Sequence, residues 1–442
     1  MPYNVVAGET RLRIGEFMTL LLAIIYLIFI SLGLPDSLFG AAWPVMHLDF
    51  GVAEGFASVY MIITAVGSGG VSFFAGPLIR KFGTGRVTVV SVFLTVAGML
   101  IIGLSVHIAM AIAGSILMGL GAGAIDTGLN NFVSTHYKAR HMNWLHAFWG
   151  IGVTLSPLIM SAFLDNGNDW RAGYRCVSYI QAGIFLIAAL SLPLWKKYEK
   201  STIEILDVPT ESANGGAEAD DALSDDGAAD ETDGTDKPKK KKIKTPVFFK
   251  VFRIPGVLWA VLSLGLYISM EFLIGTWGAS YAVNVKSVAP AVAARWISVY
   301  YGGIMAGRII SGFVSFKTDD KTLVRAGIGV MIAGMIVFAL PIGEYALTGL
   351  LLIGLGFGPV FPSTIHSVPY RFGTEYSADI TGIQMGGSYA IGWAVQLAYG
   401  FIAPKTTFAF TPYLLIVLAG LLLLTSEITN KITSKRRLSD SV

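Results

Sequence analysis

The chain has 442 residues, of which 54% are hydrophobic and only 14% are charged, and its mean hydropathy is +0.64. Soluble domains carry about 25% charged residues, so this composition predicts a protein embedded in a membrane. The net charge of +3 points to no particular partner, the single cysteine excludes an intramolecular disulfide, and the six histidines have no metal-ligand spacing.

Twelve apolar segments each approach the roughly 20 residues that a helix needs to cross a bilayer. They lie near residues 16–41, 56–79, 87–106, 109–134, 143–164, 174–195, 255–284, 293–316, 323–342, 346–369, 377–402 and 408–427. The first follows Arg11 and Arg13, as the apolar part of a cleaved signal peptide would. Its apolar run, 17–40, is longer than the roughly 7–15 residues of a signal, so we expect a retained first helix.

Lysine and arginine gather on one side of these segments, which by the positive-inside rule is the cytoplasmic side. The basic residues expected there are Arg11, Arg13, Arg80, Lys81, Arg86, Lys138, Arg140, Lys317, Lys321, Arg325, Arg371, Lys431, Lys435, Arg436 and Arg437. The opposite loops hold few: Arg171, Arg175, Lys286, Arg295 and Lys405. We predict a multi-pass protein of the inner or plasma membrane with both termini in the cytoplasm.

A polar break separates the first six segments from the last six. Its middle is acidic and has no aromatic residue, so it cannot bury enough apolar surface to fold. It then becomes basic at Lys237–Lys244, a run that occurs in nucleic-acid-binding segments. Beside a membrane helix, contact with anionic lipid headgroups explains it better. We expect an N-terminal half at 1–195, a disordered cytoplasmic linker at 196–253 and a C-terminal half at 254–442.

The two halves repeat each other. GLGAGAID at 119–126 matches GLGFGPVF at 354–361, a shift of 235 residues, and Lys81 matches Lys317 at nearly the same shift. Matched helices run in the same direction, so we predict an all-α membrane protein of twelve transmembrane helices, with two six-helix halves in a parallel pseudo-two-fold repeat. Such repeats place a substrate site at their interface near the membrane midplane.

Asp126 is an acid inside one of these segments. The glycines at 119, 121 and 123 precede it and allow close approach of a neighbouring backbone, and Asn130 shares its helical face. An acid in hydrocarbon costs several kcal/mol unless it faces a partner or a wet cavity. The carboxylate could simply hold two helices together, but the pattern favours a proton or substrate site.

Asp36 and Glu271 are two further membrane acids. Asp36 could be hydrated at the outer end of the first helix, and Glu271 could pair with Arg308, a residue for which we favour a structural role. The repeat places Glu271 one residue from the counterpart of Asp36, a helical rotation of about 100°. We therefore expect the two acids to point differently relative to their halves. We assign proton coupling to Asp36 and Asp126, and substrate contact to Glu271.

A hydroxylated substrate needs polar groups and an apolar face on which to stack. The polar candidates are Asn130, Asn131, His146, Gln384, Ser388 and Gln396, and the aromatic ones are Trp149, Trp277, Tyr281, Tyr301, Tyr389 and Trp393. Each could instead pack in the core or belong to an interfacial aromatic belt. We find no phosphate-binding loop and no nucleophile motif, and expect neither an enzyme nor a cofactor.

The stretch GPLIRKFGTGR at 76–86 resembles the signature G-x-L-x-D-R-x-G-R-R of the major facilitator superfamily. Arg80 stands where that family usually has Asp, so the charge relay that closes the inward gate lacks its acid here. Asp126, Thr127 and Asn130 match an acid-T-x-x-N pattern of the fucose-permease-like sugar transporters, which the runs at 33–44 and 143–152 also resemble. In that subfamily two membrane carboxylates are implicated in proton coupling and sugar binding. We assign gating to Gly76, Arg80, Lys81, Arg86 and Arg308.

Together these features predict proton-coupled symport of a monosaccharide or similar small polyol by alternating access. Two alternatives remain: a proton-driven efflux antiporter for drugs or metabolites, and a membrane sensor that binds without transporting. The expected partners are the small molecule, protons or Na⁺, and anionic lipid at Lys237–Lys244. We expect no nucleic-acid partner, and a monomer.

Overall fold

The computed structural model describes residues 2–137, 139–167, 169–196, 252–341, 343–373 and 377–440. Its α-helices are α1 (Pro2–Asp49), α2 (Phe56–Phe82), α3 (Thr84–Gly103), α4 (Ile108–His136), α5 (Ala139–Asp165), α6 (Trp170–Leu190), α9 (Val257–Lys286), α10 (Pro290–Val314), α11 (Asp320–Ala339), α12 (Gly343–His366), α13 (Val368–Phe372), α14 (Ser377–Ile402) and α15 (Thr411–Asp440). Nearly all of the linker expected at 196–253, including Lys237–Lys244, lies outside the described residues.

Ten of the described helices are long and apolar enough to cross a membrane, and α2 makes an eleventh if its two parts form one span. These parts meet at Phe73 with a bend of 53°. Pro77 explains the bend, because a proline ring inside a helix clashes with the carbonyl four residues earlier. The remaining long helix, α14, carries Gln384 and Gln396 and is therefore less apolar. Each of the twelve segments predicted from the sequence corresponds to one of these long helices.

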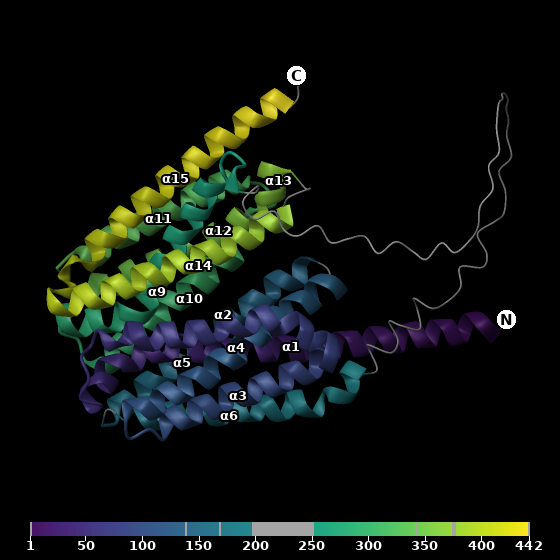
Figure 1. The fold of residues 1–442 in the computed structure, drawn as a ribbon, viewed down its shortest axis with the longest axis horizontal. Helices are drawn as coiled ribbons and strands as arrows, with labels where there is room; N and C mark the ends of the chain where they lie inside the picture. The colour runs from purple at the N-terminus through teal and green to yellow at the C-terminus, as the bar shows by residue number, and fades with distance from the viewer. Residues whose placement is uncertain are drawn as a thin grey trace, which may run out of the picture.

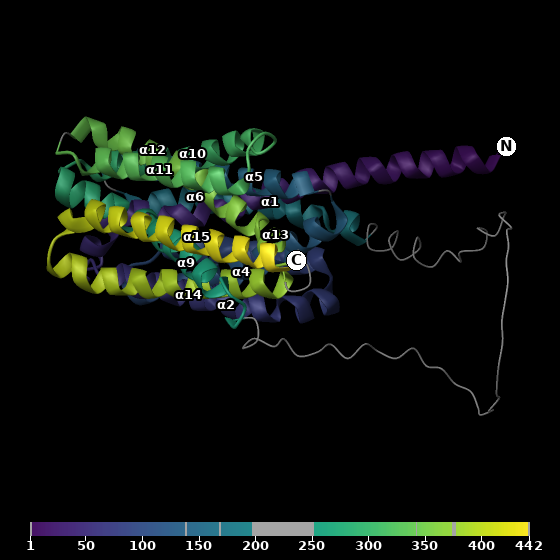
Figure 2. The ribbon, with the colours of Figure 1, turned by 90° about the horizontal axis from the view of Figure 1, so that it is seen from above.

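The helices form two bundles, α1–α6 and α9–α15, which lie side by side (Figures 1 and 2). Within the first bundle, α3 packs on α4, α2 on α4, and α1 on α5; within the second, α11 packs on α12, α10 on α12, and α9 on α14. Between the bundles, α5 packs on α10 and α2 on α14. Since the same pairings recur in both halves, the parallel repeat predicted from the sequence is confirmed.

Glycines at repeated positions explain how α4 and α12 pack so closely. A Cβ at Gly119 would overlap the carbonyl oxygen of Thr64 in α2, and one at Gly354 would overlap that of Tyr300 in α10. In both halves, therefore, a glycine of the fourth helix lets its backbone touch the backbone of the second helix. Membrane helices gain little from hydrophobic burial in lipid, so this close packing is what holds each bundle together.

Replacing Gly121 by leucine should destabilise the N-terminal bundle. A Cβ at this position would meet the Ser91 carbonyl of α3 at 2.5 Å, and a backbone atom cannot move aside as a flexible side chain can. Overpacking of this kind costs about 1–3 kcal/mol, so the melting temperature in detergent should fall by about 2–12 °C. Gly183→Leu is the matched control, because nothing lies within 4 Å of its Cβ position. Equal melting temperatures for the two variants would contradict this packing.

Candidate functional site

Asp36 lies well inside α1, not at its end. The sequence led us to expect the first helix to stop near residue 41, but α1 continues through Pro44 to Asp49. Gly33 packs directly against the backbone of Trp149 and Gly152 in α5. This contact brings the Trp149 indole to Asp36, where its Nε1 donates a hydrogen bond of 2.8 Å to Oδ2. Hydration at the outer end of a helix is therefore not what accommodates this acid.

Asp126 is positioned by the contact between α4 and α2. Gly123, nearly one turn earlier, sits against the backbone of Ser68. Asn130, one turn later, donates from Nδ2 to Asp126 Oδ1 at 2.8 Å, so the shared face predicted from the i, i+4 spacing is confirmed. The Oδ1 atom of Asn130 is buried and has no hydrogen-bond partner among the described residues. It leaves one acceptor beside the carboxylate for a further ligand.

Glu271 and Arg308 form the charged group of the C-terminal half. Arg308 of α10 and Tyr267, one turn before Glu271 on α9, both interact with the Glu271 carboxylate. The Arg308 guanidinium also lies 5.1 Å from the ring centre of Trp149, in the N-terminal half. Trp149 therefore links the halves, since its N–H group binds Asp36 and its face carries Arg308.

These charged groups face one shared space. Asp36 interacts electrostatically with both Asp126 and Glu271, and Tyr389 of α14 interacts with all three acids and with Arg308. Asp36 and Asp126 are nevertheless solvent-exposed. Because their neighbours come from both halves, that exposure is to the interior of the protein and not to lipid. Three acids against one guanidinium leave excess negative charge, which favours the binding of protons or another cation.

The two first-helix acids occupy equivalent positions, which corrects the register that we inferred from the sequence. Gly40 of α1 meets the Gly275 backbone of α9 where these helices cross, and the two residues are a shift of 235 apart. Asp36 and Glu271 each precede their glycine by four residues. The shift of 236 at Lys81 and Lys317 arises later in the chain and does not apply to these helices. Each acid therefore has the same orientation relative to its own half, and the two approach the shared space from opposite halves.

Of the predicted substrate-binding residues, some lie at this space and others do not. Asn130 and Trp149 contact its acids, and His146 and Tyr389 interact with Arg308. Tyr301 interacts with Glu271 and Asp36, and the ring of Trp393 lies 6.0 Å from that of Tyr389. The side chain of Asn131 lies outside the described residues.

The other candidates are buried in helix packing. Trp277 is covered by the rings of Tyr399 and Phe408, and Tyr281 by that of Phe338. Gln384 donates to the Ala260 carbonyl at 3.1 Å, and Ser388 bonds within its own helix to the Met385 carbonyl. Gln396 is 1% exposed, and its side-chain N and O atoms have no partner among the described residues. In this conformation none of these side chains contacts the acids.

The inter-half hydrogen bonds and ion pairs found among the described residues lie away from the chain termini. Asn284 donates to Glu54 at 3.0 Å, Arg295 pairs with Asp165 at 3.1 Å, and Ser58 bonds to the Gln396 carbonyl at 2.8 Å. Figure 1 shows the bundles meeting at that end and splaying apart toward the termini. The structure is therefore closed on the side opposite the termini. Gly76, Arg80, Lys81 and Arg86, predicted to gate, lie at the open end.

The sequence reading missed Tyr267 and the contacts of the closed side. Tyr267 could have been found, because it lies four residues before Glu271 and so shares its helical face. Glu54 and Asn284 carry no such signal. They are 230 residues apart in the chain, and only the packing of one bundle on the other brings them together.

The double variant Asn284→Ala/Arg295→Gln should open the closed side more often. Both contacts are exposed, and an exposed ion pair contributes at most about 1 kcal/mol, so we expect about a fivefold shift in population. Spin labels on the loops after α1 and α9, with Cys176 replaced, would report the change as a longer distance. Arg325→Gln is the control, since its partner Glu427 lies in the same half. An equal shift in the control would contradict the assignment.

Comparison with known proteins agrees with this architecture. The sequence model of the Major Facilitator Superfamily matches residues 25–397. The glucose/mannose transporter GlcP of Bacillus subtilis is 23% identical over 386 residues, which cover 84% of this chain and 87% of that protein. The quinolone resistance protein NorB of Staphylococcus aureus is 26% identical over 145 residues, but these cover only 33% of this chain and 31% of that protein.

Two solved structures show the same fold. The D-xylose-proton symporter superposes with a TM-score of 0.66 at 12% identity, covering 94% of this chain and 98% of the symporter. The fucose:proton symporter FucP of E. coli superposes with a TM-score of 0.57 at 14% identity, covering 93% of this chain and 98% of the symporter. At such identities the agreement concerns the arrangement of helices.

Proposed function

Because the chain belongs to the major facilitator superfamily, we propose that it couples proton movement to the symport of a monosaccharide or similar small polyol. The observation that carries the proposal is the shared space, where Asp36 and Asp126 are solvent-exposed and Asp36 interacts with both Asp126 and Glu271. Two nearby carboxylates resist being ionised together, so one of them is suited to taking up and releasing a proton.

Residues around the acids supply what a neutral polyol needs. Asn130 and Glu271 offer hydrogen-bonding groups, and Trp149 and Tyr389 offer aromatic faces. One face of Trp149 is already occupied by Arg308, so stacking of a sugar there would require its opposite face or a displaced arginine. The similarity to a glucose/mannose transporter over most of the chain supports a sugar as substrate.

Alternating access would use the contacts on the closed side as one gate. Lys and Arg concentrate at the end that carries the termini, so we assign that end to the cytoplasmic side of the cell's inner or plasma membrane. The present conformation is then inward-facing. In the outward-facing conformation the bonds of Glu54 and Asp165 across the interface would break.

A proton-driven efflux antiporter is the second candidate. It would use the same acids, and the partial similarity to a quinolone resistance protein favours it. That similarity covers a third of the chain, whereas the sugar-transporter similarity covers 84%. A membrane sensor built on this scaffold would bind a ligand without moving it, and a flux measurement separates that reading from both transporters.

The proposal is tested with purified protein in proteoliposomes and a panel of labelled hexoses, pentoses, polyols and quinolones. We expect uptake of at least one sugar or polyol, accelerated when the outside is made more acidic than the inside. Sugar binding without flux would indicate a sensor. Quinolone flux that runs against the proton gradient, with no sugar flux, would establish the antiporter and overturn the proposal.

A further inference from the structure

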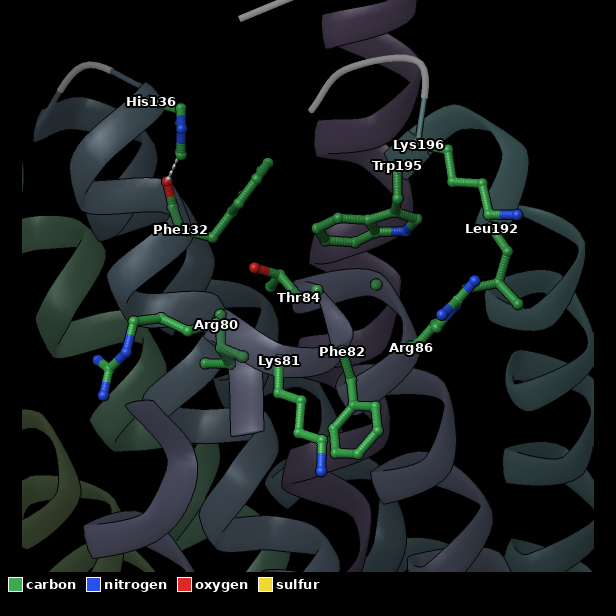
Figure 3. A pocket seen from close by; sticks show the side chains of 13 residues that line it. Arg80, Lys81, Phe82, Thr84, Arg86, Phe132, His136, Leu192, Trp195 and Lys196 are labelled. Atoms are coloured by element: carbon green, nitrogen blue, oxygen red, sulfur yellow. Dashed lines mark hydrogen bonds between the residues drawn. The ribbon is translucent and has the colours of Figure 1, made fainter. Parts of the chain in front are cut away.

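A separate cavity of about 550 Å³ opens at the end of the N-terminal half that carries the termini (Figure 3). It lies where α2 ends and α3 begins, between the last residues of α4 and those that follow α6. The aromatic rings of Phe132 and Trp195, 4.9 Å apart, form part of its wall. Gly85 allows α3 to press against the Trp195 ring, which fixes the shape of this wall.

The cavity is strongly basic. Arg80, Lys81, Arg86 and Lys196 line it, and no carboxylate is among the described residues that line it. In Figure 3, Arg86 and Lys196 lie on the side of Leu192, and Arg80 and Lys81 lie along the other rim, with Thr84 between them. None of the four cations has an ion pair or hydrogen bond in the described part of the chain.

The corresponding loop of the C-terminal half is built differently. Lys317 and Lys321 occur there, but Asp319 and Asp320 lie between them. Asp320 pairs with His366 at 2.9 Å, and a hydrogen bond with Thr322 lowers the pKa of the Asp319 carboxyl, so that it stays negatively charged. Each half thus has a basic loop at this point, but only the loop of the C-terminal half is neutralised by its own acids.

The beginning of α3 adds backbone donors to the cavity. Gly83 has a φ of +83°, which turns the chain sharply from α2 into α3, and no side chain caps the new helix. The first N–H groups of a helix point along its axis and favour an anion. Here they belong to lining residues of the basic cavity, so their effect adds to that of the four cations.

We propose that this cavity binds the phosphate group of an anionic ligand. Cationic side chains and backbone N–H groups would hold the phosphate, and the Phe132 and Trp195 rings would cover the apolar part attached to it. Phosphate of this kind is carried both by anionic phospholipid headgroups and by soluble phosphate esters. The site lies outside the space that holds Asp36, Asp126 and Glu271, and it does not depend on which substrate is transported.

The test compares phosphatidylglycerol binding to the full-length protein and to two double variants by native mass spectrometry. Arg86→Gln/Lys196→Gln removes two cavity cations, and Lys317→Gln/Lys321→Gln removes two from the C-terminal loop. A basic side chain near an anionic surface contributes about 1 kcal/mol, a factor of about five, so affinity should fall about 30-fold in the first variant. The second variant should bind as the unmodified protein does. All four side chains are on the surface loops or helix ends, so both variants are expected to fold.

Inorganic phosphate in the same titration distinguishes the two sources. If millimolar phosphate displaces the lipid, the cavity accepts soluble phosphates; if it does not, the occupant is the lipid headgroup. Either result retains the site. Unchanged affinity in the cavity variant, an equal loss in both variants, or equally tight binding of zwitterionic phosphatidylcholine would overturn it.

Discussion

Replacing Asp126 by asparagine is expected to abolish uphill accumulation of the substrate while preserving the fold. Asparagine keeps the shape of the side chain and can still bond to Asn130, but it cannot carry a proton. A gradient of one pH unit is worth about 1.4 kcal/mol, or about tenfold accumulation for a one-to-one symporter. We expect the variant to equilibrate the substrate and go no further.

Asp126→Glu is the matched comparison, because it retains a titratable group at nearly the same place. It should keep part of the pH-driven accumulation, whereas a merely structural role for Asp126 predicts that Asn is tolerated and that the longer Glu is not. Normal accumulation by Asp126→Asn would remove this residue from the proton site.

Substitution of the two equivalent acids should cause different damage. Asp36→Asn should uncouple transport, leaving exchange of labelled substrate across the membrane, because Asp36 shares its space with Asp126. Glu271→Gln should mainly weaken substrate binding, by about 10- to 100-fold, since a hydrogen bond to a charged group contributes about 1.5–3 kcal/mol. The number of protons moved per substrate should stay the same.

The measurement for this pair is substrate exchange and proton flux side by side in each variant. Arg325→Gln serves as the control, because it breaks an ion pair with Glu427 near the start of α11, and both partners lie within one half. Loss of proton flux in Glu271→Gln together with normal coupling in Asp36→Asn would show that the two roles are assigned the wrong way round. The equivalence of the two positions in the repeat makes this the sharpest internal comparison that the chain offers.

The sequence was sufficient to predict the membrane-spanning helices, because the run of apolar residues that marks each one is a local feature of the chain. Runs of about 20 apolar residues show where each span lies, and the repeat at GLGAGAID and GLGFGPVF shows how the halves are related. The family resemblance read at 76–86 is confirmed by the match to residues 25–397. The pairing of Asp126 with Asn130 was also predictable, since both lie on one face of one helix.

The features that could not be predicted from the sequence depend on contacts between helices. The apolar segment at 16–41 predicted an early end to the first helix, yet α1 continues through Pro44 to Asp49, so Asp36 lies in the interior of the helix and not near its end. Trp149 and Trp277 look alike in an apolar segment, but one faces Asp36 and the other packs against Tyr399. Periodicity gives the faces of a helix without saying which face meets which neighbour.

The most direct test of the central claim follows the pH inside proteoliposomes, with no imposed gradient, when a transported sugar is added outside. Symport through Asp36 and Asp126 predicts that the interior becomes acidic as the sugar enters, and that Asp36→Asn admits labelled sugar in exchange without this change. Sugar entry that leaves the internal pH constant in the unmodified protein, or that makes the interior alkaline, would contradict proton symport.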